Sequence, residues 1–232
     1  MADARPGWLL DELAFAGREN LDAAHVARYD AKEDADAVSE VALLTSLGLG
    51  SGSVLVDIGA GTGQLTCAAA RLCARVIAVD VSEAMLARLR AKAPPNVEVV
   101  QAGFLSYEHR GEPVDFVYSR YALHHLPDFW KAVALARMGQ MLKSRGVLRL
   151  WDVVFGFEPA EVEQRVEAWC ATGGDDVEAE WLRTELEEHV RDEHSTFTWL
   201  LEPTIERAGF AIEDVVYSDD RVFAKYVLRR TS

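Results

Sequence analysis

A short apolar run followed directly by clustered glycines constrains the fold more than any other feature of this 232-residue chain. Residues 53–58 read SVLVDI, which has the length and the branched side chains of a buried strand. Gly59, Gly61 and Gly63 follow at alternate positions, and helical periodicity begins at residues 64–72. A strand, a tight turn and a helix in this order form the opening of a βαβ unit.

The same alternation continues through the middle of the chain. Further strands are predicted at residues 75–79, 97–101, 114–118 and 146–151, with helices between them, the last of which runs from Pro127 to about residue 143. Short strands that alternate with helices form a parallel sheet covered on both faces. The expected fold class is therefore α/β, a three-layer α/β/α sandwich.

Beyond residue 158 the pattern becomes helical before two last strands. Helices are predicted at residues 159–170, 177–190 and about 196–208, and strands at 210–217 and 221–228. The tight connection between these strands predicts an antiparallel hairpin, and hence a mostly parallel seven-strand sheet with one antiparallel strand. We predict a single domain over residues 1–232: N-terminal helices at 1–47, a cofactor-binding core at 48–157, a helical lid or insertion at 158–208 and the β-hairpin at 209–232.

Two acidic residues accompany the glycine loop. Asp57 lies two residues before the first glycine, and Asp80 ends the next predicted strand. A carboxylate about 20 residues beyond such a loop accepts hydrogen bonds from ribose hydroxyls. The spacing G-x-G-x-G differs from the G-x-G-x-x-G of dinucleotide sites, and a charge at Asp57 disfavours a pyrophosphate while suiting an ammonium group. This combination favours S-adenosylmethionine over a nicotinamide dinucleotide; the competing interpretation is that both acids are ordinary strand-end caps.

The charge balance narrows the class of partner. The chain has 24 Lys and Arg against 38 Asp and Glu, a net charge of −14, which repels phosphate backbones and anionic lipids. No apolar run approaches the roughly 20 residues of a membrane helix, and residues 1–6 lack the features of a signal peptide. We therefore expect a cytoplasmic protein, monomer or homodimer, with a small-molecule substrate and neither nucleic acid nor membrane as partner.

The chain resembles the class I S-adenosylmethionine-dependent methyltransferases, a seven-strand Rossmann-like family, and within it the small-molecule branch. Four segments in order carry the resemblance: VLVDIGAGTGQL at 54–65, VIAVDVSEAML at 76–86, DFVYSRYALHHLPD at 115–128 and LKSRGVLRLWD at 142–152. It implies transfer of a methyl group from S-adenosylmethionine to a small acceptor, at oxygen or nitrogen rather than carbon, leaving S-adenosylhomocysteine. Two alternatives stay open: intramolecular cyclisation or elimination that releases methylthioadenosine, and a non-catalytic accessory protein that binds S-adenosylmethionine.

The resemblance also implies a cofactor site. The backbone of Gly59, Ala60 and Gly61 would contact the methionine part, Asp57 its amino group and Asp80 the ribose. The remaining implied cofactor residues are Tyr29, Gly63, Val81, Met85, Gly103, Phe104, Ser119 and Arg120.

The two ends of that implied site match the family less closely. Tyr29, with Asp30 and Lys32, resembles the segment by which N-terminal helices close over the cofactor, and a surface helix end is the competing interpretation. Family members often present an Asp to the adenine amino group after the third strand, but this sequence has Gly103 and Phe104 there.

Candidate catalytic residues follow the fourth strand. Methyl transfer is an in-line displacement at an activated carbon, so a base is needed only where the acceptor must lose a proton. Tyr121, His124 and His125 lie where the substrate pocket is expected to open, and His194 in the insertion is a second candidate base. The histidines could instead contact the cofactor or pack in the pocket wall. His189 and His194, five residues apart, match no metal-binding motif, so no metal site is predicted.

Overall fold

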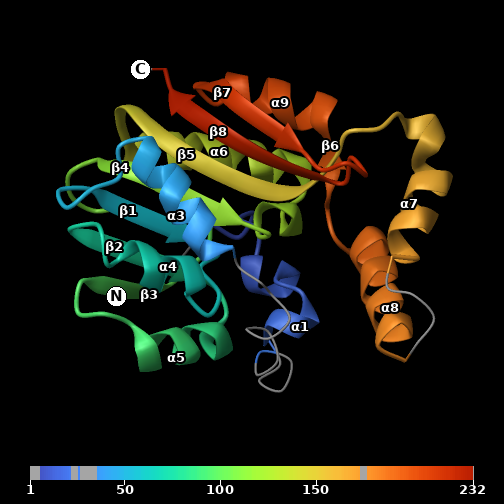
Figure 1. Ribbon diagram of the computed structural model, residues 1–232, viewed down its shortest axis with the longest axis horizontal. Coiled ribbons are helices and arrows are strands. Elements are labelled where there is room, and N and C mark those ends of the chain that lie inside the picture. The colour runs from blue at the N-terminus through green and yellow to red at the C-terminus, as the bar shows by residue number, and fades with distance from the viewer. Residues whose placement is uncertain (1–5, 22–25, 27–35, 173–176, 232) are drawn as a thin grey trace.

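A mostly parallel sheet forms the centre of the computed structural model, which describes residues 6–21, 26, 36–172 and 177–231 (Figure 1). Its main strands are β1 (Val54–Ile58), β2 (Arg75–Asp80), β3 (Val97–Gln101), β4 (Val114–Arg120), β5 (Leu142–Phe155), β7 (Phe210–Tyr217) and β8 (Phe223–Arg230). Their order is β3-β2-β1-β4-β5-β8-β7, and β8 is antiparallel to both of its neighbours. The predicted α/β class with one antiparallel strand is therefore confirmed.

Helices cover both faces of this sheet, as expected for three layers. On one face lie α3 (Ala37–Ser46), α4 (Gln64–Ala69) and α5 (Glu83–Lys92); on the other lie α6 (Asp128–Met141) and α9 (Thr198–Arg207). The Ser82 side chain caps α5 by accepting a hydrogen bond from the Met85 N–H at 3.2 Å. No described helix has the length and apolar composition needed to cross a membrane.

Strand pairing moves two element boundaries away from the sequence prediction. The predicted strand at 146–151 extends over Leu142–Phe155, because β4 pairs with its beginning, β8 with its middle and a short strand, β6 (Thr196–Phe197), with its end. β6 was expected to be part of a helix, which instead begins at Thr198. Pairing partners distant in sequence produced both differences.

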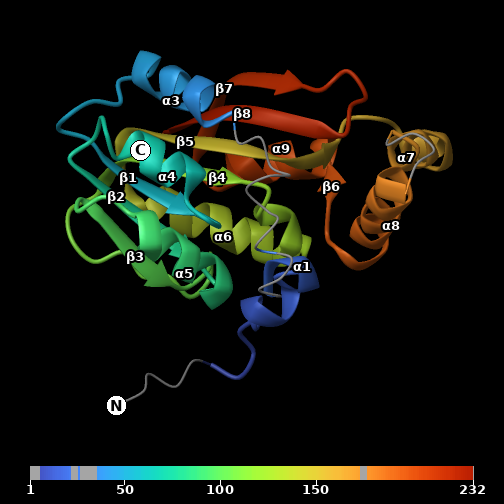
Figure 2. The same ribbon diagram turned by 60° about the horizontal axis from the view of Figure 1, so that its bottom comes forward.

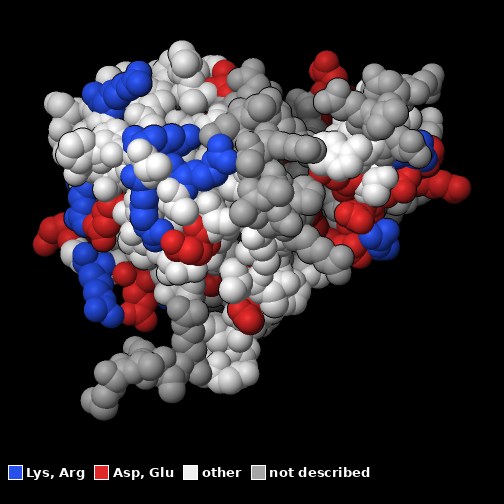
Figure 3. Space-filling view, turned by 90° about the horizontal axis from the view of Figure 1, so that it is seen from below, with Lys and Arg blue, Asp and Glu red and all other residues white. Residues whose placement is uncertain are grey.

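Smaller elements lie at the carboxyl ends of the parallel strands. They are the turns η1 (Glu12–Phe15), η2 (Leu123–His125) and η3 (Pro159–Glu161), the short helix α1 (Arg18–Leu21) and the helices α7 (Val162–Cys170) and α8 (Val177–Asp192). Helices α7 and α8, called the arm below, project from the body of the molecule (Figure 2). Acidic side chains gather on the arm, as Figure 3 shows.

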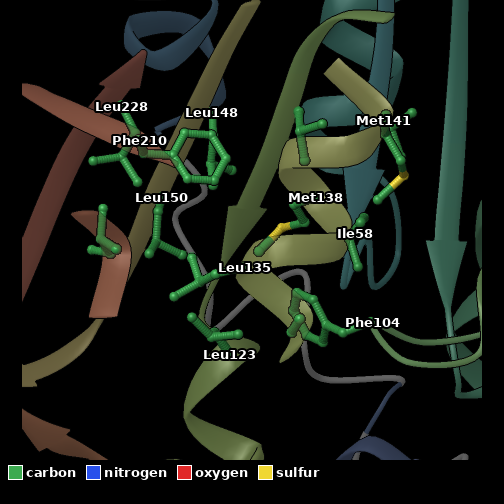
Figure 4. Close-up of a cluster of buried hydrophobic side chains, with 14 of the residues drawn as sticks. Ile58, Phe104, Leu123, Leu135, Met138, Met141, Leu148, Leu150, Phe210 and Leu228 are labelled. Atoms are coloured by element: carbon green, nitrogen blue, oxygen red, sulfur yellow. The ribbon is translucent and has the colours of Figure 1, made fainter. Parts of the chain in front are cut away.

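The largest apolar cluster lies between the sheet and α6. Leu135 and Met138 of α6 pack against Leu148 and Leu150 of β5, and Phe210 of β7 closes the cluster (Figure 4). All five side chains are buried, and burying each contributes roughly 1.5–3 kcal/mol to folding. This cluster packs α6 against the sheet from whose strand ends the candidate site is built.

A buried ion pair crosses the opposite face. The Arg149 guanidinium of β5 donates two hydrogen bonds to the Glu40 carboxylate of α3, at 2.8 and 2.7 Å. Both residues are less than 5% exposed, so each charge depends on the other for compensation. The pair therefore fixes α3 on the sheet.

Candidate functional site

The glycine loop after β1 adopts a conformation that side chains would obstruct. Gly59, Gly61 and Gly63 have φ angles of 75°, 54° and 83°, in the left-handed region. The N–H groups of Gly59 and Ala60 both donate to the Val79 carbonyl, which ties the loop to β2. A Cβ at Gly59 would lie 2.3 Å from the Ala122 Cβ. The loop thus needs glycine for its turn and for its contact with the segment after β4.

Asp80 holds this loop from the end of β2. One carboxylate oxygen accepts from the Gly61 N–H and the other from the Ser82 N–H, both at 2.8 Å. Burial raises the pKa of Asp80, and these backbone N–H groups oppose the rise. Because each carboxylate oxygen can accept more than one hydrogen bond, the side chain can bind hydroxyl groups while supporting the loop.

Asp57 lies under the same loop. Its carboxylate is buried and accepts a hydrogen bond from the Thr66 hydroxyl at 2.5 Å. Burial raises the pKa of Asp57 to about 7, and the charge of Asp80 adds to the rise. A cation bound beside Asp57 would therefore favour the ionised form of its carboxylate.

Two adjoining pockets meet at the loop. The first has a volume of about 610 Å³ and the second about 460 Å³. Both are lined by Gly59, Gly61, Arg120 and Tyr121, so one ligand can extend through the two. These sizes fall in the range of small-molecule sites.

The structure brings most of the predicted cofactor residues to these pockets. The predicted cofactor residues that line the first pocket are Gly59, Gly61, Asp80, Val81, Met85, Gly103, Phe104 and Arg120. Those that line the second are Asp57, Gly59, Ala60, Gly61 and Arg120. Gly63 instead packs against Leu89, and Ser119 is buried with its hydroxyl lacking a hydrogen-bond partner among the described residues. Tyr29, with Asp30 and Lys32, lies outside the described residues.

Glu12 is a pocket residue that sequence reasoning missed. It comes from η1, is buried, and its carboxylate accepts from the Leu105 N–H at 2.9 Å. A Cβ on Gly103 would lie 2.3 Å from the Glu12 Oε1. Since Glu12 lies far from the motifs in the sequence, no local signal identifies it.

Arg120 and Tyr121 form a wall that both pockets share, and the ring of Trp151 packs against them. The Arg120 guanidinium lies 4.1 Å from the ring centroid of Trp151 and 4.7 Å from that of Tyr121. Tyr121 has a φ of 49° and its N–H donates to the Trp151 carbonyl at 2.9 Å. The end of β4 is thereby held where Arg120 and Tyr121 both line the pockets.

His124 lies behind this wall, between two carboxylates. Its Nδ1 pairs with Asp152, and its Nε2 lies 3.1 Å from Glu193. Burial opposes a charge on the ring, but the two carboxylates outweigh it and raise the pKa of His124 to about 10. Asp152 also accepts from the N–H groups of Leu123 and His124, at 2.8 and 3.2 Å, and so fixes the turn η2.

His125 has the opposite environment and lines the first pocket. Burial, together with the neighbouring charge of His124, lowers the pKa of His125 to about 3, so its ring is neutral near pH 7. Its buried Nδ1 has no hydrogen-bond partner among the described residues. The structure therefore places Tyr121 and His125 at the pocket wall.

The other two candidate catalytic residues lie elsewhere. His194 donates its N–H to the His124 carbonyl at 3.0 Å, and its ring tilts against Phe15. Burial lowers the pKa of His194. Neither His124 nor His194 lines either pocket, and the catalytic roles of all four candidates stay predictions.

Together the sheet, the glycine loop and the acid at the end of β2 define a protein that binds a nucleoside-containing ligand at the carboxyl ends of its strands. Comparisons with known proteins agree. The family described as "Methyltransferase domain" matches residues 55–146. An uncharacterized methyltransferase of Bacillus licheniformis is 31% identical over 165 residues, which cover 66% of this chain and 78% of the relative. An uncharacterized methyltransferase from a Geobacillus strain is 33% identical over 113 residues, which are 49% of this chain. The chain spans about half, 53%, of the length of that relative.

A solved structure shares the fold. The magnesium protoporphyrin IX methyltransferase of Synechocystis, with S-adenosylhomocysteine bound, superposes with a TM-score of 0.60 at 18% identity, over 84% of this chain and 82% of that one. The chain belongs to the class I S-adenosylmethionine-dependent methyltransferase family, which uses S-adenosylmethionine as methyl donor.

Proposed function

We propose that this methyltransferase acts on a small-molecule acceptor, at an oxygen or a nitrogen atom. The observation that carries the proposal is the first pocket, a cleft of about 610 Å³ between the N-terminal segment and the segment after β4. Glu12, Ala16 and Asn20 line one side of it, and Tyr121 and His125 another. An acceptor that reaches the methyl group between these walls must be small enough to enter.

The surface charge supports the same class of acceptor. The net charge is −14, and acidic side chains gather on the arm (Figure 3). A polyanion such as RNA or DNA would be repelled there. We therefore infer that the acceptor is not a nucleic acid.

The residues present fit the donor. Asp80 suits the ribose hydroxyls, Asp57 the amino group and Arg120 the carboxylate of the methionine part. The loop at Gly59, where a Cβ would collide with Ala122, leaves bare backbone against which the ligand can lie. S-adenosylmethionine, when bound, supplies a methyl group on a positively charged sulfur, which is activated for transfer.

At the adenine end we infer a role for Glu12. Its buried carboxylate lines the pocket beside Gly103 and Phe104, where an acceptor of hydrogen bonds suits the exocyclic amino group of adenine. Leu105 holds one carboxylate oxygen in place. The N-terminal segment would in this way recognise the base.

In the reaction, the protein would align the donor and the acceptor. Where the acceptor carries a proton, that proton must also be removed. Tyr121 and His125 lie on the pocket wall; the lowered pKa of His125, about 3, keeps its ring neutral near pH 7 but makes it a weak base, so its part would be to accept a hydrogen bond and orient the acceptor. Exclusion of water by the walls favours displacement by the acceptor over hydrolysis.

The test combines calorimetric titration of the purified protein with mass spectrometry of the donor. We expect S-adenosylmethionine to bind and to survive overnight incubation without an acceptor, and a panel of small phenols, carboxylic acids and amines to yield a methylated product. Acceptor-free release of methylthioadenosine would instead establish the intramolecular reaction. Binding with no product from small acceptors, together with methylation of a protein or RNA fraction, would overturn the proposal.

A further inference from the structure

Three side chains that can ligate a metal ion converge beside the first pocket. His124, His125 and Glu193 each offer one ligand atom, and these atoms all lie within 4.8 Å of one another. The histidines come from η2, and Glu193 follows the arm helix α8. The set is absent from any sequence motif, because it joins two segments that only the fold brings together.

We propose that His124, His125 and Glu193 bind a divalent transition-metal ion of the zinc class. Two imidazoles and one carboxylate form a ligand set that zinc, cobalt, manganese and iron accept. Magnesium and calcium prefer sites made of oxygen atoms alone. The metal site is independent of the identity of the acceptor proposed above.

Asp152 and His189 contact two of the three proposed ligands from outside the cluster and orient them. Asp152 pairs with the Nδ1 of His124, which leaves Nε2 directed at Glu193. A carboxylate behind a metal-binding histidine fixes the ring and makes its other nitrogen a better ligand. Glu193 in turn contacts the Nδ1 of His189, four residues earlier on the arm. Asp152 and His189 would thus support the ligands from both sides.

A metal ion would give the buried Nδ1 of His125 a partner, which a proton shared between His124 and Glu193 does not. A proton between the Nε2 of His124 and Glu193 satisfies that pair, whose atoms are 3.1 Å apart. It does nothing for the Nδ1 of His125, which is buried, lies 3.9 Å from Glu193 and has no hydrogen-bond partner among the described residues. An ion with bonds of about 2.0–2.1 Å in a tetrahedron holds its ligand atoms roughly 3.3 Å apart, so small shifts suffice to engage all three.

The site has a consequence for the pocket. Three protein ligands leave one position of a tetrahedral ion for water or for a substrate atom. Since His125 also lines the first pocket, the ion would stand at its wall and join the arm to the core. Removing the ion is expected to loosen the arm without abolishing donor binding, because the donor residues Asp57 and Asp80 lie on other strands.

The experiment measures metal binding directly, with no need for a known acceptor. Tag-free protein is stripped with a chelator and titrated with Co²⁺, whose visible absorption reports nitrogen and oxygen coordination, and zinc content is measured after equilibrium dialysis. We expect one saturable ion per chain. Glu193→Gln and His125→Asn should each weaken binding at least tenfold. Glu187→Gln, on the preceding helix α8 with its charge paired to Arg183 at the surface, is the matched control and should bind as wild type does.

Two other outcomes would overturn the proposed metal site. Absence of saturable binding to the stripped protein would do so, and so would equal binding by Glu193→Gln, which would point to adventitious coordination at Cys67 or elsewhere. Circular dichroism shows whether each variant is folded, and a titration of Glu193→Gln with S-adenosylmethionine shows whether its donor site is intact. Wild-type protein that binds S-adenosylmethionine but no metal would overturn this proposal and leave the proposed function standing.

Discussion

The carboxylate of Glu12 fills the space that a side chain at Gly103 would otherwise take. A Cβ on Gly103 would lie 2.3, 2.6 and 2.8 Å from the three carboxyl atoms of Glu12, and the next turn holds Glu12 through the Leu105 N–H. A glycine after β3 therefore admits an acid from the N-terminal segment. Within the proposed function this acid would recognise adenine.

Replacing Glu12 with Gln tests that role. Hydrogen bonds to a charged acceptor contribute about 1.5–3 kcal/mol, so we expect affinity for S-adenosylhomocysteine to fall roughly 10- to 150-fold by calorimetry. Wild type should also discriminate strongly against S-inosylhomocysteine, in which an oxygen replaces the amino group, and Glu12→Gln should lose most of that discrimination. Asp11→Asn keeps the cap of η1 and leaves Glu12 in place, so equal losses in both variants would refute base recognition.

Donor binding should depend on pH through Asp57. A carboxylic acid with a pKa of about 7 is largely protonated at lower pH and then offers no charge to the donor's ammonium group. Affinity for S-adenosylmethionine is expected to rise by up to tenfold per unit between about pH 5.5 and pH 7. Methylthioadenosine lacks the amino acid part and should bind without this dependence, as should S-adenosylmethionine to Asp57→Asn. A parallel rise for both ligands would assign the effect to another group.

Gly59→Ala should abolish donor binding and destabilise the fold. The new Cβ would lie 2.3 Å from Ala122, and the φ of 75° disfavours any side chain. Gly48→Ala is the matched control, because Gly48 has a φ of 106° and a Cβ added there would have nothing within 4 Å. Urea unfolding should show a loss of more than about 2 kcal/mol at Gly59 and a smaller loss at Gly48. Similar losses at both positions would show that backbone strain alone matters.

The Glu40–Arg149 pair should be costly to break. Glu40→Gln leaves the Arg149 charge buried without compensation, and we expect a loss of about 3–5 kcal/mol in the free energy of unfolding. Glu98→Gln removes the half-exposed pair with Arg75 and should cost less than about 1 kcal/mol. Denaturant midpoints at constant m-value compare the two variants. Equal small losses would mean that water reaches the Glu40–Arg149 pair.

Much of the fold follows from local patterns. The strand at residues 53–58, the glycine loop and the capping by Ser82 are each readable from neighbours in sequence, because turn conformation and burial periodicity act over a few residues. The short strand β6 was missed because two residues carry no periodicity, and only their pairing with Val154 and Phe155 makes them a strand.

The sequence by itself determined the class of the protein: an α/β sheet whose glycine loop, Asp57 and Asp80 lie at adjacent strand ends, since parallel strands bring their carboxyl ends to one edge. Only the tertiary structure decided which distant groups meet there. Glu12 reaches Gly103, and Glu193 reaches His124 and His125, through packing of the N-terminal segment and the arm against the strand ends. Contacts between segments far apart in the chain leave no local pattern, because they depend on where each element packs rather than on its neighbours in sequence.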